Sequence, residues 1–190
     1  MGIFNLFKNK EKKLIFNKKL DALTQVFNAY SFFGEEKHTF NNEIINNYCN
    51  SNNANDILAV AMSYLGEGAK SRKDAIYYFE KYLENPTSQK YFSNWLIYSS
   101  LADLYEKEYV FDKALICLQN LIKLDNNTNC ADYTRIGNVL TKIDINQAVD
   151  YYKSLKKEKI YSQYEEIFDN AYREVLLKKE KGYVYKPRKK

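Results

Sequence analysis

The amino-acid sequence predicts an all-α protein. Apolar residues recur at steps of three and four along most of the chain, the spacing of one helix face, and no stretch alternates as a strand does. The 190 residues include only 6 Gly and 2 Pro, too few for the many turns of an all-β fold. Turn-forming residues separate segments of roughly 10 to 18 residues, which is the length of ordinary globular helices.

The N-terminal part of the chain predicts a short leading segment and two helices. Residues 1–14 place four apolar side chains before a run of lysines, and this stretch lacks the apolar core of a signal peptide. Residues 15–32 carry apolar side chains on one helical face, and a second helix is expected around residues 40–48. The first helix would use Leu20, Leu23, Val26, Phe27 and Tyr30, and the second Phe40, Ile44, Ile45 and Tyr48.

The middle of the chain contains an internal repeat. Ala75, Ala114 and Ala148 are each followed by large apolar residues four and seven positions later. These residues are Phe79 and Tyr82, Leu118 and Leu121, and Tyr152 and Leu155. Each alanine is preceded by a helix whose apolar residues follow steps of three, one and three, with a small residue third. The three sets are Ile57, Val60, Ala61 and Tyr64; Tyr98, Leu101, Ala102 and Tyr105; and Tyr133, Ile136, Gly137 and Leu140.

This pattern resembles the tetratricopeptide repeat, a helix–turn–helix unit of 34 residues. The three units would span residues 54–87, 95–128 and 130–156. The resemblance implies a right-handed α-solenoid of antiparallel helix pairs, in which the small residue of the first helix lets the second helix approach closely. The two preceding helices would form a divergent further pair.

The last predicted helix covers residues 158–179 and would cap the solenoid. Its apolar stripe is the clearest in the chain and consists of Ile160, Tyr164, Ile167, Phe168, Ala171, Tyr172, Val175 and Leu176. A basic, flexible tail is expected at residues 182–190. Residues 15–181 are therefore expected to form one helical-repeat domain.

The residues needed for catalysis or metal binding are scarce. His38 is the only histidine, and Cys49, Cys117 and Cys130 are too few and too unevenly spaced for a zinc site or a disulfide framework. Residues 66–71 have a glycine-rich sequence, but they lack the first glycine and the Gly-Lys pair of a phosphate loop, so an inter-helix turn is expected. We expect no catalytic, cofactor or metal site and no enzymatic activity.

The remaining expectation is recognition of a protein or peptide. In the tetratricopeptide family, the first helices of successive units line a concave groove that binds peptides, and the resemblance implies this role for thirteen positions. They are Asn55, Leu58, Met62 and Leu65; Leu96, Ser99, Asp103, Glu106 and Lys107; and Thr134, Asn138, Thr141 and Lys142. An alternative at this stage is that flanking helices cover part of this set.

The net charge of +5 is an average over unlike parts of the chain. Residues 1–19 carry +5 and residues 173–190 carry +6, so residues 20–172 carry −6. An acidic body favours a basic or neutral peptide and argues against nucleic acid as the main partner. Nucleic-acid binding through the basic ends, contact of residues 3–13 with an anionic membrane surface, and a peptide-sensing or toxin-neutralising regulator stay open as alternatives. The composition and unpaired cysteines are typical of a cytoplasmic bacterial protein.

Overall fold

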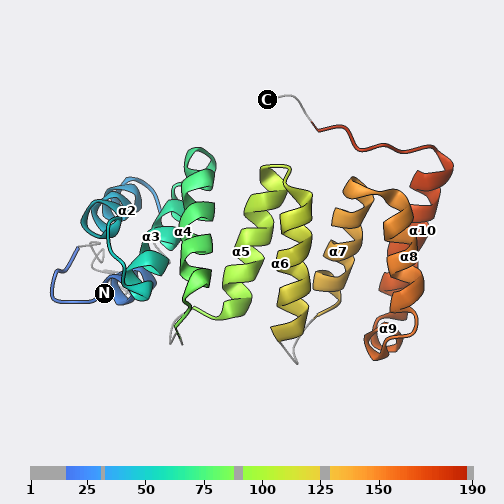
Figure 1. Ribbon diagram of the computed structural model, residues 1–190, viewed down its shortest axis with the longest axis horizontal. Coiled ribbons are helices and arrows are strands. Elements are labelled where there is room, and N and C mark those ends of the chain that lie inside the picture. The colour runs from blue at the N-terminus through green and yellow to red at the C-terminus, as the bar shows by residue number, and fades with distance from the viewer. Residues whose placement is uncertain (1–15, 31–32, 88–91, 125–128, 188–190) are drawn as a thin grey trace, which may run out of the picture. The chain divides into compact units, whose positions relative to one another are not determined.

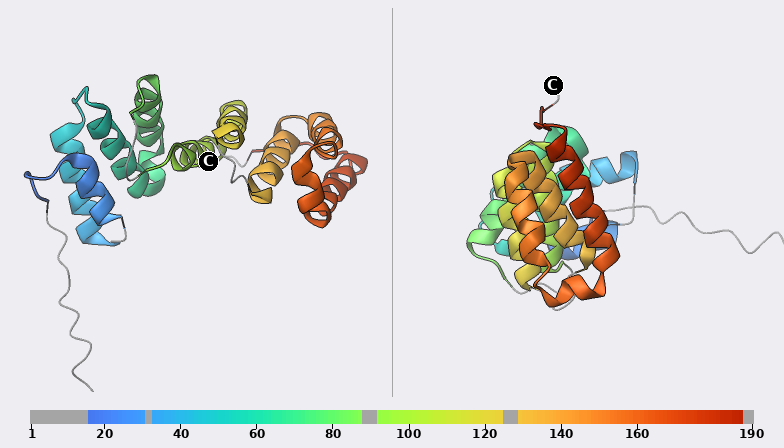
Figure 2. Two further views of the ribbon diagram at one scale, coloured as in Figure 1. Left: turned by 90° about the horizontal axis from the view of Figure 1, so that it is seen from below. Right: turned by 90° about the vertical axis from the view of Figure 1, so that its right-hand side faces the viewer.

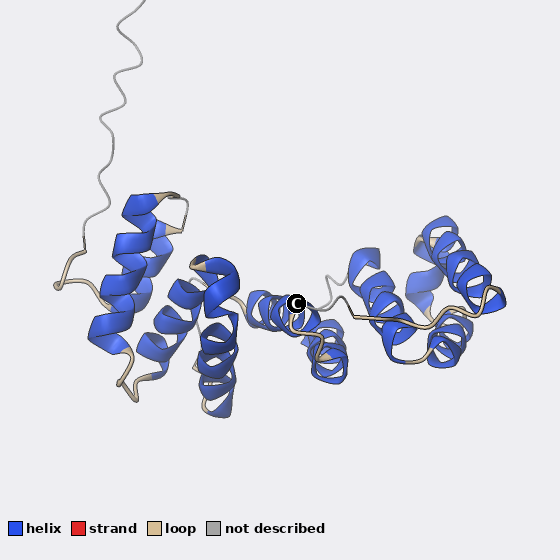
Figure 3. Cartoon of the chain, turned by 90° about the horizontal axis from the view of Figure 1, so that it is seen from above, coloured by secondary structure: helices blue, strands red, loops and turns tan. Residues whose placement is uncertain are grey.

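The computed structural model describes residues 16–30, 33–87, 92–124 and 129–187. Within these ranges every regular element is a helix, which confirms the all-α prediction (Figure 3). The chain divides into two compact units, Met1–Tyr91 and Phe92–Lys190, which we describe separately. The predicted segment 1–14 lies outside the described residues.

Unit 1 is organised around a central helix, α3, whose middle is buried. Its helices are α1 (Ala22–Ala29), α2 (Glu35–Tyr48), α3 (Ala54–Gly66), the 3₁₀ turn η1 (Gly68–Ser71) and α4 (Arg72–Glu84). The α3 helix packs against α1, α2 and α4. Seven consecutive residues of α3, from Ile57 to Ser63, are buried. A helix covered on several sides must be apolar on most of its surface, and this explains the long run of apolar residues in α3.

Unit 2 consists of helices packed in sequential order. They are α5 (Asn94–Lys107), α6 (Phe111–Leu124), α7 (Cys130–Ile143), α8 (Ile145–Leu155), α9 (Lys159–Gln163) and α10 (Glu165–Glu180). Each of the first three packs against the next, and α10 packs against both α7 and α8 (Figures 1 and 2). Because connections between these helices are short, neighbours run antiparallel.

Most repeat positions identified in the sequence lie in the cores of the two units, whereas Tyr64, Tyr98 and Tyr133 are half-buried. The three aligned alanines are fully buried, and the large side chains four and seven residues later are at most 2% exposed. Gly137 shows why the third position of each first helix is small: a Cβ added there would overlap the ring of Tyr152 in α8. The predicted close approach of the two helices is therefore confirmed for α7 and α8.

Side-chain caps fix where α3, α5, α7 and α8 begin. Asn53, Asn129 and Asp144 accept hydrogen bonds from backbone amides of the first turns of α3, α7 and α8, at 2.8–2.9 Å for the shortest bond of each. Ser93 Oγ accepts from the Leu96 amide at 3.3 Å and caps α5. A polar side chain at this position satisfies amides that have no partner within the helix.

Two predicted helices differ from the observed ones. The helix expected over residues 15–32 is shorter, because Asp21 caps it and α1 begins at Ala22. The helix expected over residues 158–179 is interrupted at Tyr164, which separates α9 from α10. In a continuous helix, residues seven apart are displaced by about 10 Å along the axis. The interruption instead brings the rings of Tyr161 and Phe168 into a stack with centroids 5.5 Å apart.

Candidate functional site

Seven of the thirteen predicted groove residues line two pockets, one in each unit. Met62 and Leu65 line the pocket of unit 1. Five others, namely Asp103, Glu106, Asn138, Thr141 and Lys142, line the pocket of unit 2. The remaining six lie outside these two pockets.

Those six residues differ in exposure. Leu58 is fully buried in the core of unit 1. Asn55 is exposed, and its side-chain oxygen accepts a hydrogen bond from Thr87 Oγ1 at 3.1 Å. Leu96, Ser99 and Thr134 are half-buried, and Lys107 is exposed.

The unit 2 pocket lies between α5 and α7 and has a volume of about 430 Å³. We call it the α5–α7 pocket. Its lining residues are Asp103, Glu106, Arg135, Asn138, Thr141, Lys142, Lys178 and Tyr183. Two first helices of successive predicted repeats supply six of these residues, and α10 with the chain after it supplies the other two.

An ion-pair network forms one wall of the α5–α7 pocket. Arg135 of α7 bonds to Asp103 and, through Nε at 2.9 Å, to Glu106 Oε1. Lys142 Nζ lies 2.8 Å from the other oxygen of Glu106. Two acids thus face two bases, and this wall carries no net charge. Because Glu106 and Arg135 are only about one fifth exposed, the network is partly shielded from solvent and holds α5 and α7 in register.

An aromatic cluster borders the same pocket. The Lys142 ammonium lies 5.1 Å from the centroid of the Phe111 ring, so it joins the ion-pair network to the start of α6. Phe111 also contacts the ring of Tyr109 at 6.2 Å and that of Tyr185 at 5.1 Å, both edge to face. Tyr109 lies in the turn between α5 and α6 with φ +63°.

The chain after α10 returns toward this aromatic cluster. We call residues 182–187 the C-terminal segment; in Figure 1 it leaves the end of α10 and passes along the same end of α7. Gly182 has φ +64°, and the Tyr183 amide donates to the Lys178 carbonyl at 3.0 Å, the geometry of a Schellman cap. Tyr183 lines the pocket and Tyr185 packs on Phe111, whereas the sequence predicts a flexible tail here. The contacts of these two rings hold the segment against unit 2.

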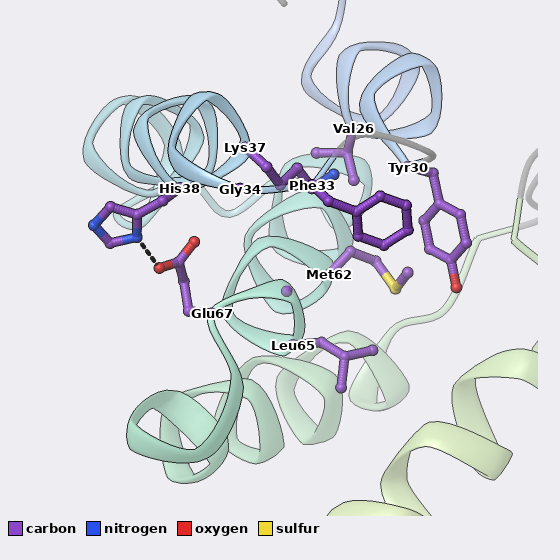
Figure 4. Close-up of a pocket in the computed structure, with 10 residues that line it drawn as sticks. Val26, Tyr30, Phe33, Gly34, Lys37, His38, Met62, Leu65 and Glu67 are labelled. Atoms are coloured by element: carbon purple, nitrogen blue, oxygen red, sulfur yellow. Dashed lines mark hydrogen bonds and ion pairs between the residues drawn. The ribbon is translucent and has the colours of Figure 1, made fainter.

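The unit 1 pocket combines apolar and polar side chains and has a volume of about 540 Å³ (Figure 4). We call it the α1–α3 pocket. Its lining residues are Val26, Tyr30, Phe33, Gly34, Lys37, His38, Met62, Leu65, Gly66 and Glu67. Figure 4 shows the rings of Tyr30 and Phe33 beside Met62, and Phe33 is 87% exposed. The aromatic rings therefore form an open mouth above an apolar floor.

Polar residues close one side of the α1–α3 pocket. Glu67 bonds to His38 Nδ1 and accepts from Asn41 Nδ2 at 2.7 Å. Lys37 Nζ donates to the Ala29 carbonyl at 2.6 Å, and desolvation lowers the pKa of this lysine despite the opposing effect of Glu67. These bonds tie α2 to α1 and to the end of α3.

The glycine-rich stretch at residues 66–71 is a turn, as predicted. It covers the last residue of α3 and the 3₁₀ turn η1 that leads into α4. Across the described ranges, no three His, Cys, Asp or Glu side chains gather at metal-binding distances.

Six residues in or beside the α5–α7 pocket were not among the predicted groove positions, namely Tyr109, Phe111, Arg135, Lys178, Tyr183 and Tyr185. Arg135 was detectable, because it lies three residues before Asn138 and seven before Lys142 and so shares their helix face. Tyr183 and Tyr185 also left a signal, since they alternate in an extended stretch directly after a helix-ending glycine.

No protein-family model, curated protein or solved structure matches this chain. No helix in the described part is long and apolar enough to cross a bilayer.

Proposed function

We propose that this protein is a non-catalytic peptide- or protein-binding module and that α3–α4, α5–α6 and α7–α8 are tetratricopeptide-like repeats of an α-solenoid. The repeat assignment is supported by the burial, in all three pairs, of the aligned alanine and of the large residues four and seven positions after it. The binding assignment is supported by one observation above others. Five residues predicted for the groove converge on the α5–α7 pocket from two successive first helices.

The chemistry of the α5–α7 pocket suits an extended peptide. Asn138 is exposed and offers both an amide donor and a carbonyl acceptor, which match the alternating groups of a peptide backbone. The hydroxyl of Thr141 is already committed to the Gly137 carbonyl at 2.8 Å. The ion-pair network holds the surrounding side chains in place, so little conformational entropy is lost when a ligand binds.

A peptide-display selection against the full chain tests this proposal. Selected peptides should lose affinity about tenfold or more for Asn138→Ala, because the exposed amide is the principal free hydrogen-bonding group of the wall. Gln147→Ala in α8 is the matched control, since Gln147 is an exposed amide outside the pocket. Circular dichroism checks that both variants keep their helicity.

Two outcomes would contradict the proposal. One is a selection that yields no peptide whose binding depends on Asn138. The other is binding to nucleic acid or anionic vesicles that survives Asn138→Ala and is lost when the lysines of the two ends are replaced. The second outcome would favour the alternative of a surface binder that uses its basic ends.

A further inference from the structure

We infer that the surface formed by the α5–α7 pocket and the adjacent Phe111 ring recognises an extended segment with two aromatic side chains separated by one residue, and that the C-terminal segment lies on this surface and competes for it. This inference rests on the proposed function and deepens it, because it names the ligand pattern and a form of self-competition. All the residues concerned belong to unit 2.

The C-terminal segment already has the conformation of a bound peptide. The Schellman cap at Gly182 ends α10 and directs the following residues away from the helix axis. Tyr183 then lines the pocket and Tyr185 contacts Phe111, whereas Val184 between them is 73% exposed. Alternation of this kind is the mark of an extended chain with one face docked.

Phe111 provides a receptor for the second aromatic ring. Its centroid lies 5.1 Å from that of Tyr185 with the ring planes 88° apart, which is a favourable edge-to-face geometry. Tyr109 and Lys142 hold Phe111 from other directions. Such a ring cluster at the edge of a polar pocket favours an aromatic side chain over an aliphatic one.

Aromatic contacts, rather than charge, carry the selectivity of this surface. Asp103 and Glu106 are already paired with Arg135 and Lys142, so the acids of the wall have little attraction left for a basic ligand. The charge of the acidic body therefore does not identify the ligand at this pocket. The ligand is identified instead by the pattern Tyr-x-Tyr, which places two aromatic rings on one side of an extended chain.

The C-terminal segment is held weakly enough to be displaced. Beyond its cap, the described contacts are those of the two tyrosines, and Lys186 and Pro187 are exposed. A segment tethered by one turn competes at an effective concentration that reaches about millimolar. It therefore lowers the apparent affinity for any external peptide of the same pattern.

A labelled peptide with the sequence of residues 181–187 tests the inference on the full chain. The variant Tyr183→Ser/Tyr185→Ser should bind this peptide about tenfold or more tightly than the wild type does, because its own segment no longer competes. Adding Phe111→Leu should remove most of that gain while keeping apolar volume at the start of α6. The matched control adds Ile116→Ser instead, since Ile116 is an exposed apolar residue of α6 outside the pocket.

Three results would overturn the inference. They are equal binding by the wild type and the double tyrosine variant, binding that is unchanged by Phe111→Leu, and binding that is unchanged when both tyrosines of the peptide are replaced by serine. Light scattering adds a fourth. A doubled mass that disappears in the double tyrosine variant would place the segment on a second copy of the chain.

The outcome of this experiment is independent of the outcome of the peptide-display selection that tests the proposed function. If the labelled peptide binds as expected but display selects no external ligand, the proposed function fails and the docking of the segment stands. If display selects Asn138-dependent peptides without paired aromatic residues, the proposed function stands and the ligand pattern is wrong.

Discussion

Tyr109 adopts a backbone conformation that usually belongs to glycine. Among the described residues it is the only non-glycine with positive φ, and it occupies the C′ position of a Schellman cap. The Val110 amide donates to the Tyr105 carbonyl at 2.9 Å and completes the motif. Gly182 occupies the equivalent position at the end of α10, and as a glycine it adopts positive φ without steric strain. The ring contact with Phe111 offers a reason for the tyrosine, since it supports the aromatic cluster.

Replacing Tyr109 with glycine should stabilise the fold and weaken peptide binding. We expect the free energy of unfolding to rise by about 0.5–1 kcal/mol, because glycine adopts positive φ without steric cost. Tyr109→Ala is the matched control, since alanine retains the backbone strain and loses the ring. Urea denaturation of the two variants measures the difference. A glycine variant less stable than the alanine variant would show that strain is not relieved at this position.

Tyr152 should be tolerant of losing its hydroxyl. Its ring is fully buried, and its hydroxyl has no hydrogen-bond partner among the described atoms. Burial, with a smaller effect of Glu174, raises the pKa of Tyr152 to about 12. Tyr152→Phe should therefore leave stability at pH 7 unchanged or raise it by up to about 1 kcal/mol, because a buried polar group without a partner is removed.

The same substitution predicts a difference at alkaline pH. Above pH 10 the unfolded tyrosine ionises while the folded one stays neutral, so the wild type loses stability between pH 10 and about pH 12. The phenylalanine variant lacks this contribution. Urea midpoints of both proteins at pH 8, 10 and 11 should diverge in favour of the variant, and parallel curves would refute the assignment. The other tyrosines are present in both proteins, so their contributions to the pH dependence of stability cancel in the comparison.

At the scale of helices, the approach of α7 to α8 depends on one missing methyl group. Gly137→Ala would place a Cβ inside the ring of Tyr152, and overpacking of this kind costs about 1–3 kcal/mol. The gain in helix propensity, about 1 kcal/mol, offsets only part of that cost. Gly68→Ala does not serve as a control because of its positive φ, but Asn138→Ala, on the exposed side of the same helix, does. Thermal unfolding should show a lower midpoint for Gly137→Ala alone.

The interrupted C-terminal helix shows why element boundaries are harder to predict than elements. The apolar stripe of residues 158–179 is continuous in the sequence, and a single helix accounts for it. The structure instead breaks at Tyr164 and stacks Tyr161 on Phe168. Tyr161 also donates to the Asp169 carboxylate, and Lys156 Nζ lies 3.1 Å from the same group. These contacts join the end of α8, the short helix α9 and the beginning of α10. Helical periodicity in the sequence does not predict contacts between separate helices.

At the scale of the whole molecule, the distribution of charge separates the proposed function from its main rival. Peptide binding at an internally neutralised pocket should change little with ionic strength, because its main contacts are aromatic and hydrogen-bonded. Binding of nucleic acid by the basic ends should fall steeply over the same range, since it depends on counterion release. Affinities measured between about 50 and 500 mM salt distinguish the two. A steep decline for the peptide would contradict the assignment to the α5–α7 pocket.

The sequence alone determined that the chain is helical and that the aligned alanines, with the large residues four and seven positions after them, belong to the core. These features depend on local periodicity, since side chains three or four residues apart share a helix face and must be buried together. Only the tertiary structure decided which of the remaining side chains, those near the surface, contact one another. Arg135 and Lys142 form ion pairs with Asp103 and Glu106, which lie 29 to 36 residues away in the sequence. Tyr185 contacts Phe111 at a larger sequence separation. Partners so far apart are selected by how helices pack, and no spacing along the chain specifies them.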